Sequence, residues 1–384
     1  MKLFGTFNTS FKTSQQLSFK MKIGILGTRG IPNHYGGFEQ FAEYLSVGLV
    51  NLGAEVWVYN SHNHPCQEKV WKNVNLIHCF DPEYKIGLAG QFVYDFNCIL
   101  DSRNRNFDIL LQLGYTTNSI WYKLLPSKTK VVTNMDGLEW QRSKYNRFLR
   151  WFLKYAEKFA AKSSNLLIAD SKPINEYLKT SYSVPTLHIS YGADIFDTPN
   201  AELLKPFGLL PQQYFLLIAR LQPDNHIEEI IKGVIASNSQ KPLLVIGNTN
   251  NAFGNYLKNK YSSSQMRFLG SIFDKEMLNQ LRYFCKLYFH GHSAGGTNPS
   301  LLEAMAASAP ICAHNNAFNQ SVLGGDAFYF ENEDQIVEIL KNKLGKPNIE
   351  LFKQNNLVKI KLNHAWKNII LDYYKAFTEI IHSD

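Results

Sequence analysis

The sequence has no apolar segment long enough to carry the chain across a membrane. No run approaches the roughly eighteen consecutive apolar residues that a spanning helix needs. Residues 1–20 are basic and polar and lack the continuous apolar core of a signal peptide; they predict a disordered leader or an upstream start ahead of Met21. We therefore expect a cytoplasmic protein.

Clustered cysteines and metal ligands are also missing. The five cysteines are scattered without a C-x-x-C pair, which is typical of reduced thiols in the cytosol. His290 and His292 have no third ligand near them in the sequence, and no acidic pair of the D-x-D type follows a strand. The sequence therefore predicts no bound metal and no other cofactor.

Acidic residues are too few to balance the basic ones. The chain has 40 lysines and arginines against 32 acidic residues, a formal net charge of +8. This excess indicates an acidic partner, such as a nucleic acid, an anionic membrane or a phosphate-rich ligand. The basic residues do not alternate with aromatic ones in a recognisable nucleic-acid module, so we expect no nucleic-acid partner.

The 384 residues exceed the length at which one hydrophobic core usually stops growing, so two domains are expected. Both halves repeat a short apolar strand, a turn and an amphipathic helix, which predicts two doubly wound, Rossmann-like α/β domains. The expected strands are Lys22–Gly27, Glu55–Tyr59, Asn75–Cys79, Ile109–Leu113, Lys130–Asn134, Leu166–Ala169, Tyr214–Ala219, Leu243–Ile246, Met266–Leu269, Leu287–His290 and Pro310–Ala313.

The break between the halves is expected in residues 197–211, which collect prolines and lack strand character. The N-terminal domain would then cover residues 21–200 and the C-terminal domain residues 201–363. Residues 364–384 read as one amphipathic helix, which we expect to cross back to the N-terminal domain. Ligands of open parallel sheets bind beyond the carboxyl ends of the strands, so motifs directly after strands are the candidates for a site.

Two glycines, Gly36 and Gly37, follow the first strand and precede a helix. Their amides can approach a phosphate because no side chain stands in the way, although a tight turn alone would also explain them. Arg29, His34 and Glu39 lie in or beside this loop and are candidates for the acceptor side of a cleft.

The stretch FHGHSAGGTNPSLLEAMAASAPI combines a strand end, three glycines and a helix start. Asn298 is a good N-cap, and Pro299 suits the first helical position. The amides of Gly296, Thr297 and Asn298 therefore form an anion site with the helix dipole behind them. Glu303 lies one turn inside, where its carboxylate can accept two hydrogen bonds from a ribose diol; alternatively, it only balances the helix N-terminus.

Two further residues follow strands. Arg220 leaves the first strand of the second half and suits bidentate capture of a diphosphate, although a solvated loop arginine is the plainer alternative. Asp136 follows the strand at 130–134 and could act as a base or orient an acceptor hydroxyl; as part of a bare Asp-Gly pair it could equally be a turn residue.

Together these motifs resemble those of GT-B glycosyltransferases of the retaining family 4 type, from Met21 to the C-terminus. The matching blocks are the GG-x-E loop at Gly36–Glu39, the strand–Arg–Leu block at Ala219–Leu221 and the LLEAMA-x-x-AP block at Leu301–Pro310. In addition, GTRGIPNHYGGFEQF and NMDGLEWQRSKY are similar to the N-terminal domain of bacterial surface-polysaccharide glycosyltransferases, many of them described as rhamnosyltransferases.

The resemblance implies two domains facing a cleft and metal-independent, retaining transfer of a sugar from a nucleotide-diphosphate donor, with dTDP-rhamnose as one candidate. The acceptor would be a glycan or a lipid-linked sugar of surface polysaccharide synthesis. Arg220 and, from the opposite domain, Gly37 would contact the diphosphate, and Glu303 would hold the ribose. The nucleobase would meet Gly270, Ser271 and Ile272.

Three positions depart from the family pattern: Gly295 replaces its first glutamate, Asn225 its lysine, and Asp136 its histidine. The first two keep open a non-catalytic nucleotide-sugar-binding protein as an alternative. A second alternative is a nicotinamide-dependent nucleotide-sugar epimerase or dehydrogenase, because Gly24, Gly27 and Gly30 fit a dinucleotide loop. The strand VWVYNSH, however, lacks the acidic residue that would hold an adenosine ribose.

The segment from Arg147 to Lys162 has helical periodicity with two adjoining faces. We expect its aromatic stripe (Phe148, Phe152, Tyr155 and Phe159) to pack on the sheet of the N-terminal domain. Its basic stripe (Arg147, Arg150, Lys154 and Lys158), with Trp151 at the edge, would then be either a solvated face or a peripheral contact with an anionic inner leaflet.

Overall fold

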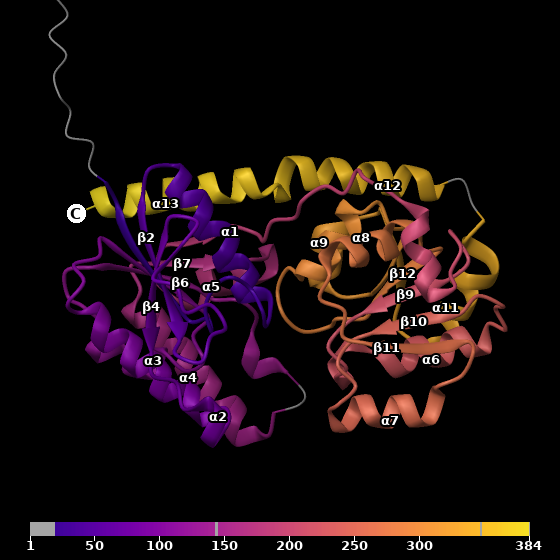
Figure 1. The fold of residues 1–384 in the computed structure, drawn as a ribbon, viewed down its shortest axis with the longest axis horizontal. Helices are drawn as coiled ribbons and strands as arrows, with labels where there is room; N and C mark the ends of the chain where they lie inside the picture. The colour runs from indigo at the N-terminus through magenta and orange to yellow at the C-terminus, as the bar shows by residue number, and fades with distance from the viewer. Residues whose placement is uncertain (1–19, 143–144, 346–347, 384) are drawn as a thin grey trace, which may run out of the picture.

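A computed structural model describes residues 20–142, 145–345 and 348–383, which form two α/β domains side by side (Figure 1). The predicted leader at residues 1–20 lies, apart from Lys20, outside the described residues. The architecture confirms the expected fold class of two Rossmann-like domains.

The sheet of the N-terminal domain has eight strands in the order β3-β4-β2-β1-β5-β6-β7-β8. All are parallel to their neighbours except β3, which pairs antiparallel with β4. Their bounds are β1 Lys22–Leu26, β2 Glu55–Ser61, β3 Val70–Trp71, β4 Val74–Cys79, β5 Ile109–Leu113, β6 Lys130–Asn134, β7 Leu166–Ala169 and β8 Thr186–His188. Every residue of β5 and β7 is buried, because helices cover both faces of the sheet.

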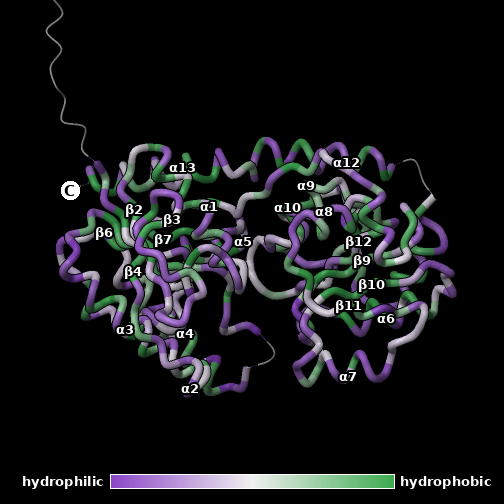
Figure 2. Tube along the Cα trace, in the orientation of Figure 1, coloured by the Kyte–Doolittle hydropathy of each residue, from purple (hydrophilic) through white to green (hydrophobic). Residues whose placement is uncertain are grey.

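The sheet of the C-terminal domain has six parallel strands in the order β11-β10-β9-β12-β13-β14. Their bounds are β9 Phe215–Ile218, β10 Leu243–Ile246, β11 Met266–Gly270, β12 Leu287–His290, β13 Ile311–His314 and β14 Phe328–Phe330. Apolar residues concentrate in these strands, as the hydropathy colouring shows (Figure 2). The carboxyl ends of both sheets face the junction of the domains.

The covering helices are α1 Gly37–Asn51, α2 Glu83–Ile86, α3 Ala89–Ser102, α4 Arg147–Ser163, α5 Lys172–Ser181, α6 Ile227–Ala236, α7 Ala252–Tyr261, α8 Lys275–Phe284, α9 Pro299–Ala306, α10 Ala317–Leu323, α11 Glu333–Glu338, α12 Asn348–Lys359 and α13 Trp366–His382. Short 3-10 and π turns join some of them. Within the part of the chain that the structure describes, no helix combines the length and the apolarity needed to cross a bilayer.

Helices α12 and α13 run along one side of both domains (Figure 1). Helix α13 packs on α1 and buries Trp366, Tyr373 and Phe377 in the core of the N-terminal domain. The Tyr373 hydroxyl accepts a hydrogen bond from Asn134 at the end of β6, at 2.8 Å. Helix α13 therefore completes the N-terminal domain.

The expected packing of α4 is wrong in part. Its buried face consists of Leu153, Ala156, Glu157, Ala160 and Ala161, and the three small alanines let the helix lie close to the sheet. The aromatic stripe instead turns outward: Phe148 is 74% exposed and Tyr155 43%, and only Phe152 and Phe159 are half-buried.

Candidate functional site

The two predicted glycine motifs lie opposite each other across the junction of the domains. A Cβ atom at Gly36 would lie 3.3 Å from Nη2 of Arg220, and one at Gly37 would lie 3.8 Å from Cγ of Pro299. The N-terminus of α1 therefore faces both Arg220 and the N-terminus of α9. Two helix N-termini and one guanidinium around the same space form a site suited to an anion.

A cavity of about 550 Å³ opens beside this contact. It is lined mainly by the N-terminal domain, and it brings together five predicted residues: Arg29, Gly37, Glu39, Asp136 and Arg220. The other predicted site residues do not line it. Carboxylates, guanidinium groups and aromatic rings share its wall, a mixture that can bind sugar hydroxyl groups by hydrogen bonds and sugar faces by apolar contact.

Asp136 occupies a left-handed backbone conformation (φ 48°) directly after β6, which turns its side chain toward the cavity. Tyr191 donates a long hydrogen bond to its carboxylate at 3.5 Å. Burial and the nearby Glu139 raise the pKa of Asp136 to about 6, although Arg142 and Arg220 oppose this shift. A carboxylate with that pKa can exchange a proton near neutral pH.

The side chain of Arg29 is held in the cavity wall by contacts with neighbouring residues. Its guanidinium donates two hydrogen bonds to Glu83, at 2.7 and 2.8 Å, and lies 3.8 Å from the ring centroid of Tyr35. The carboxylate of Glu39 accepts the backbone N–H of Arg29 at 3.0 Å. His34 points elsewhere and packs edge-on against His64.

Asp95 is a cavity residue that the sequence did not reveal. It lies in the middle of α3, is 4% exposed, and accepts a hydrogen bond from the hydroxyl of Thr117. Burial raises its pKa to about 7. The sequence does not indicate that this aspartate is buried, because a single aspartate in an amphipathic helix is typical of the solvated face.

The loop before α9 packs against the N-terminal domain. A Cβ atom at Gly296 would lie only 1.7 Å from Oδ1 of Asp170, which follows β7, and the hydroxyl of Thr297 donates to the Asp170 carbonyl at 2.7 Å. Asp170 is 1% exposed, and neither carboxyl oxygen accepts a hydrogen bond of normal geometry from the described residues. Burial, reinforced by Asp136, raises the pKa of Asp170 well above its usual range. Asn298 caps α9 as predicted, accepting from the N–H of Ser300 at 3.0 Å.

The remaining donor-side predictions lie around this loop. Asn225 is buried and donates to the carbonyl of Arg220 at 2.7 Å, so it holds the arginine loop instead of extending into the cavity. Gly270 ends β11 in a left-handed conformation (φ 73°) with open space where a side chain would be, and Ser271 and Ile272 follow it. Glu303 forms an ion pair with Arg282 of α8 at 2.5 Å.

The glycines of the alternative dinucleotide loop are used for packing. A Cβ atom at Gly24 would lie 2.7 Å from the ring of Phe107, one at Gly27 2.2 Å from a backbone oxygen, and one at Gly30 2.4 Å from the side chain of Asn60. Each approach explains its glycine without a bound cofactor. The described residues also contain no group of three or more His, Cys, Asp or Glu side chains placed to hold a metal ion.

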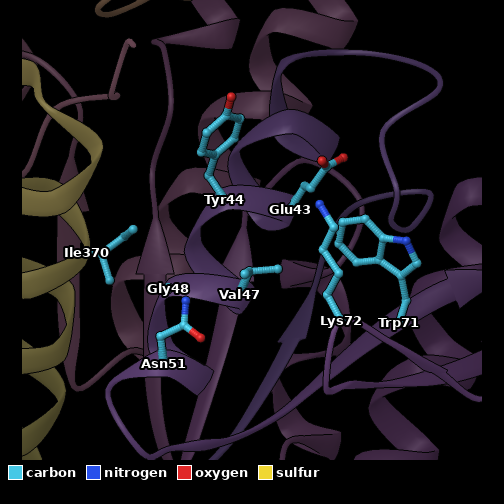
Figure 3. A pocket seen from close by; sticks show the side chains of 8 residues that line it. All are labelled: Glu43, Tyr44, Val47, Gly48, Asn51, Trp71, Lys72 and Ile370. Atoms are coloured by element: carbon cyan, nitrogen blue, oxygen red, sulfur yellow. The ribbon is translucent and has the colours of Figure 1, made fainter.

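A second cavity, of about 310 Å³, shares no lining residue with the first (Figure 3). It is lined by α1, by Trp71 of β3, by Lys72 of the turn that follows, and by Ile370 of α13. None of the predicted site residues lines it, so the cavity that contains Asp136 and Arg220 is the candidate functional site.

Comparisons with known proteins agree with this architecture. A family model described as a domain of unknown function, DUF1972, matches residues 20–194, which is the N-terminal domain. No curated protein matches the sequence. Among solved structures, sucrose-phosphate synthase from Thermosynechococcus elongatus is similar at a TM-score of 0.76 and 14% identity, covering 95% of this chain and 100% of that one.

Two further solved structures have the same arrangement of domains. HepE from Anabaena, in complex with UDP and glucose, is similar at a TM-score of 0.72 and 13% identity, covering 94% of this chain and 100% of that one. A glycosyltransferase from Rickettsia africae is similar at a TM-score of 0.69 and 13% identity, covering 95% and 100%. At these identities the similarity establishes the fold, which is that of the GT-B glycosyltransferases.

Proposed function

We propose that this protein is a glycosyltransferase that moves a sugar from a nucleotide-diphosphate donor to an acceptor held in the N-terminal domain. The observation that carries the proposal is the meeting of Asp136 and Arg220 in one cavity, beside two opposed helix N-termini. Known structures also support the proposal, because the similar proteins include a glycosyltransferase and a protein solved in complex with UDP and glucose.

The reaction that fits this site is retaining and needs no metal. The bond between the sugar C1 and the diphosphate oxygen breaks, and Arg220 and the amides of α1 and α9 stabilise the charge that develops on the diphosphate. The acceptor hydroxyl, oriented by Asp136, attacks C1 from the same face. Its proton passes to the departing phosphate oxygen. Contact between the domains excludes water that would otherwise hydrolyse the donor.

For the finer assignment we favour dTDP-rhamnose as donor and a glycan or lipid-linked sugar of bacterial surface polysaccharide as acceptor. This rests on the resemblance of the Gly36 and Asp136 loops. A panel of dTDP-, UDP- and GDP-sugars, screened by thermal shift and by donor hydrolysis, tests it. Asp136→Asn should lose turnover while binding the donor, whereas Asp334→Asn, an exposed carboxylate in the C-terminal domain, should behave as wild type.

The proposed place of action is an anionic membrane surface. Six large apolar side chains on α2, at Leu88 and on α4 are exposed, and we call them the α2–α4 set: Tyr84, Ile86, Leu88, Phe148, Trp151 and Tyr155. Leu88 also lines the cavity, together with Leu149 and Phe152 of α4. A lipid-linked acceptor could therefore enter directly from the membrane. Exposed aromatic groups beside cations are typical of interfacial binding.

Sedimentation with vesicles containing anionic lipid tests this location. Arg147, Lys158 and Lys162 are exposed cations of α4, whereas Lys154 is tied to the buried Glu157 and is left unchanged. The triple change of these three exposed cations to Glu should abolish binding, since each cation near the surface adds about 1 kcal/mol. The matched control changes Lys232, Lys258 and Lys341 of the C-terminal domain to Glu. Equal sedimentation of both variants would refute the location.

A non-catalytic nucleotide-sugar-binding protein is the second candidate, and Gly295 favours it because no side chain at that position can contact a donor sugar. A Cβ atom there would find its nearest neighbour, Nη2 of Arg142, at 3.7 Å, and the backbone has φ 108°. Binding of a nucleoside diphosphate without turnover for any donor and acceptor pair would support this candidate.

A further inference from the structure

Arg282 is the bulkiest fully buried side chain among the described residues. It lies on the inner face of α8, 1% exposed. Its Nη2 donates to Oε2 of Glu303 at 2.5 Å and its Nη1 to Oδ1 of Asn279 at 3.0 Å. A buried guanidinium is costly without a charged partner, and Glu303 is the carboxylate that supplies one.

The second oxygen of Glu303 points to the other domain. Its Oε1 accepts a hydrogen bond from Nε2 of Gln40, on the first turn of α1, at 3.2 Å. The side chain of Glu303 retains 18% exposure. The two oxygens of one carboxylate are thus divided: Oε2 is held by the buried arginine, and Oε1 faces the interdomain space.

This division matters for a nucleotide at this site, an assignment that rests on the proposed function. A carboxylate binds a ribose diol when each of its oxygens accepts a hydrogen bond from one hydroxyl group. Because Oε2 lies against the buried Arg282 and Oε1 lies against Gln40 of the other domain, Oε1 is the oxygen placed for a ligand. Gln40 marks the position at which a single ligand hydroxyl would bind.

We infer that Arg282 determines specificity for the sugar of the nucleotide. By holding Oε2 of Glu303, it leaves Oε1 to bind one ribose hydroxyl, so that nucleotide affinity does not depend on the 2′-hydroxyl. The site therefore accepts 2′-deoxyribonucleoside diphosphates as well as ribonucleoside diphosphates. Arg282 acts through Glu303 and is a positioning residue.

Isothermal titration with nucleotide pairs that differ only in the 2′-hydroxyl tests the inference: UDP against 2′-deoxy-UDP, and GDP against 2′-deoxy-GDP. For the wild type, the two dissociation constants of the pair that binds should agree within about threefold, because no second oxygen reads the 2′-hydroxyl. Arg282→Met, which is apolar and similarly long, should release Oε2. The ribonucleotide should then bind about tenfold more tightly than its deoxy counterpart.

Two controls separate this effect from a general loss of structure. Arg105→Met removes another arginine–carboxylate pair, that with Asp101 on α3, and should leave the ratio at the wild-type value. Arg282→Lys keeps the charge and should also keep the wild-type ratio, even where both affinities fall. A wild-type preference of tenfold or more for the ribonucleotide would overturn the inference while leaving the proposed function intact. Failure of every nucleoside diphosphate to bind would overturn both.

Discussion

Replacing Gly296 by alanine should separate the two domains. A Cβ atom there would lie 1.7 Å from Oδ1 of Asp170, whereas ordinary contact begins at about 3.4 Å. The loop must therefore retreat by about 1.7 Å, because Asp170 is buried and has little room to turn. Displacement of reacting groups by about 1 Å can cost roughly 100-fold in rate, so kcat/KM should fall by at least about 100-fold, or about 2.7 kcal/mol.

The assay is the kcat/KM of sugar transfer, with thermal unfolding as a check that the variant folds. Gly325→Ala is the matched control, because a Cβ atom at Gly325 meets nothing within 4 Å. Asp170→Ala in the Gly296→Ala background should restore part of the activity by removing the atoms that clash. If Gly296→Ala alone retains activity within twofold of wild type, the domains do not approach this closely in the active protein, and the reasoning fails.

The remaining predictions concern the cavity and its support. Arg220→Ala should weaken nucleotide-diphosphate binding by about 1.5–3 kcal/mol in calorimetry, the value of one charge-assisted contact, and unchanged affinity would remove Arg220 from the donor site. Turnover should fall as the pH drops through about 6, where Asp136 becomes protonated, and Asp136→Asn should lose this dependence in a pH–rate profile. The pKa of Asp136 is raised above that of an unfolded aspartate, so the native state binds more protons than the unfolded state between about pH 4 and 6. The contribution of Asp136 to the free energy of unfolding should therefore decrease as the pH rises through that window. Activity should survive excess EDTA; its loss, and its recovery with Mg²⁺ or Mn²⁺, would contradict metal independence. Glu157→Leu should lower the free energy of unfolding by about 1–3 kcal/mol in urea titration, because Trp140, Tyr177 and Tyr182 lose the buried carboxylate that accepts their hydrogen bonds.

The sequence predicted the strands that lie in the middle of each sheet. Runs such as Ile109–Leu113 are apolar throughout because both of their faces are covered, and their ends mark where site motifs begin. Strands β3, β8 and β14 were not predicted, since two or three residues carry too little pattern. The prediction for α4 was wrong because the helix packs through small residues, Ala156 and Ala160, whose size permits the close approach, and not through its large aromatic residues.

The motif residues of the site were easier to find than their supports. Gly36 and Arg220 follow strands, where a parallel sheet places its ligands, and they do lie together. Arg282, Asp170 and Asp95 are single charged residues with no motif around them. Each of them is buried against residues that are distant in the sequence. A local sequence pattern does not predict such contacts.

The packing of α13 on α1 has a consequence for how the protein is made. During synthesis the N-terminal domain emerges first, and domains generally fold in that order. Here the groove beside α1 stays empty until Trp366, Tyr373 and Phe377 leave the ribosome, so the helix that carries Gly37 and Gln40 is seated last. A nascent chain thus cannot complete the packing of α1 before α13 has been made, and a product that lacks α13 would expose this unfilled groove to chaperones and proteases.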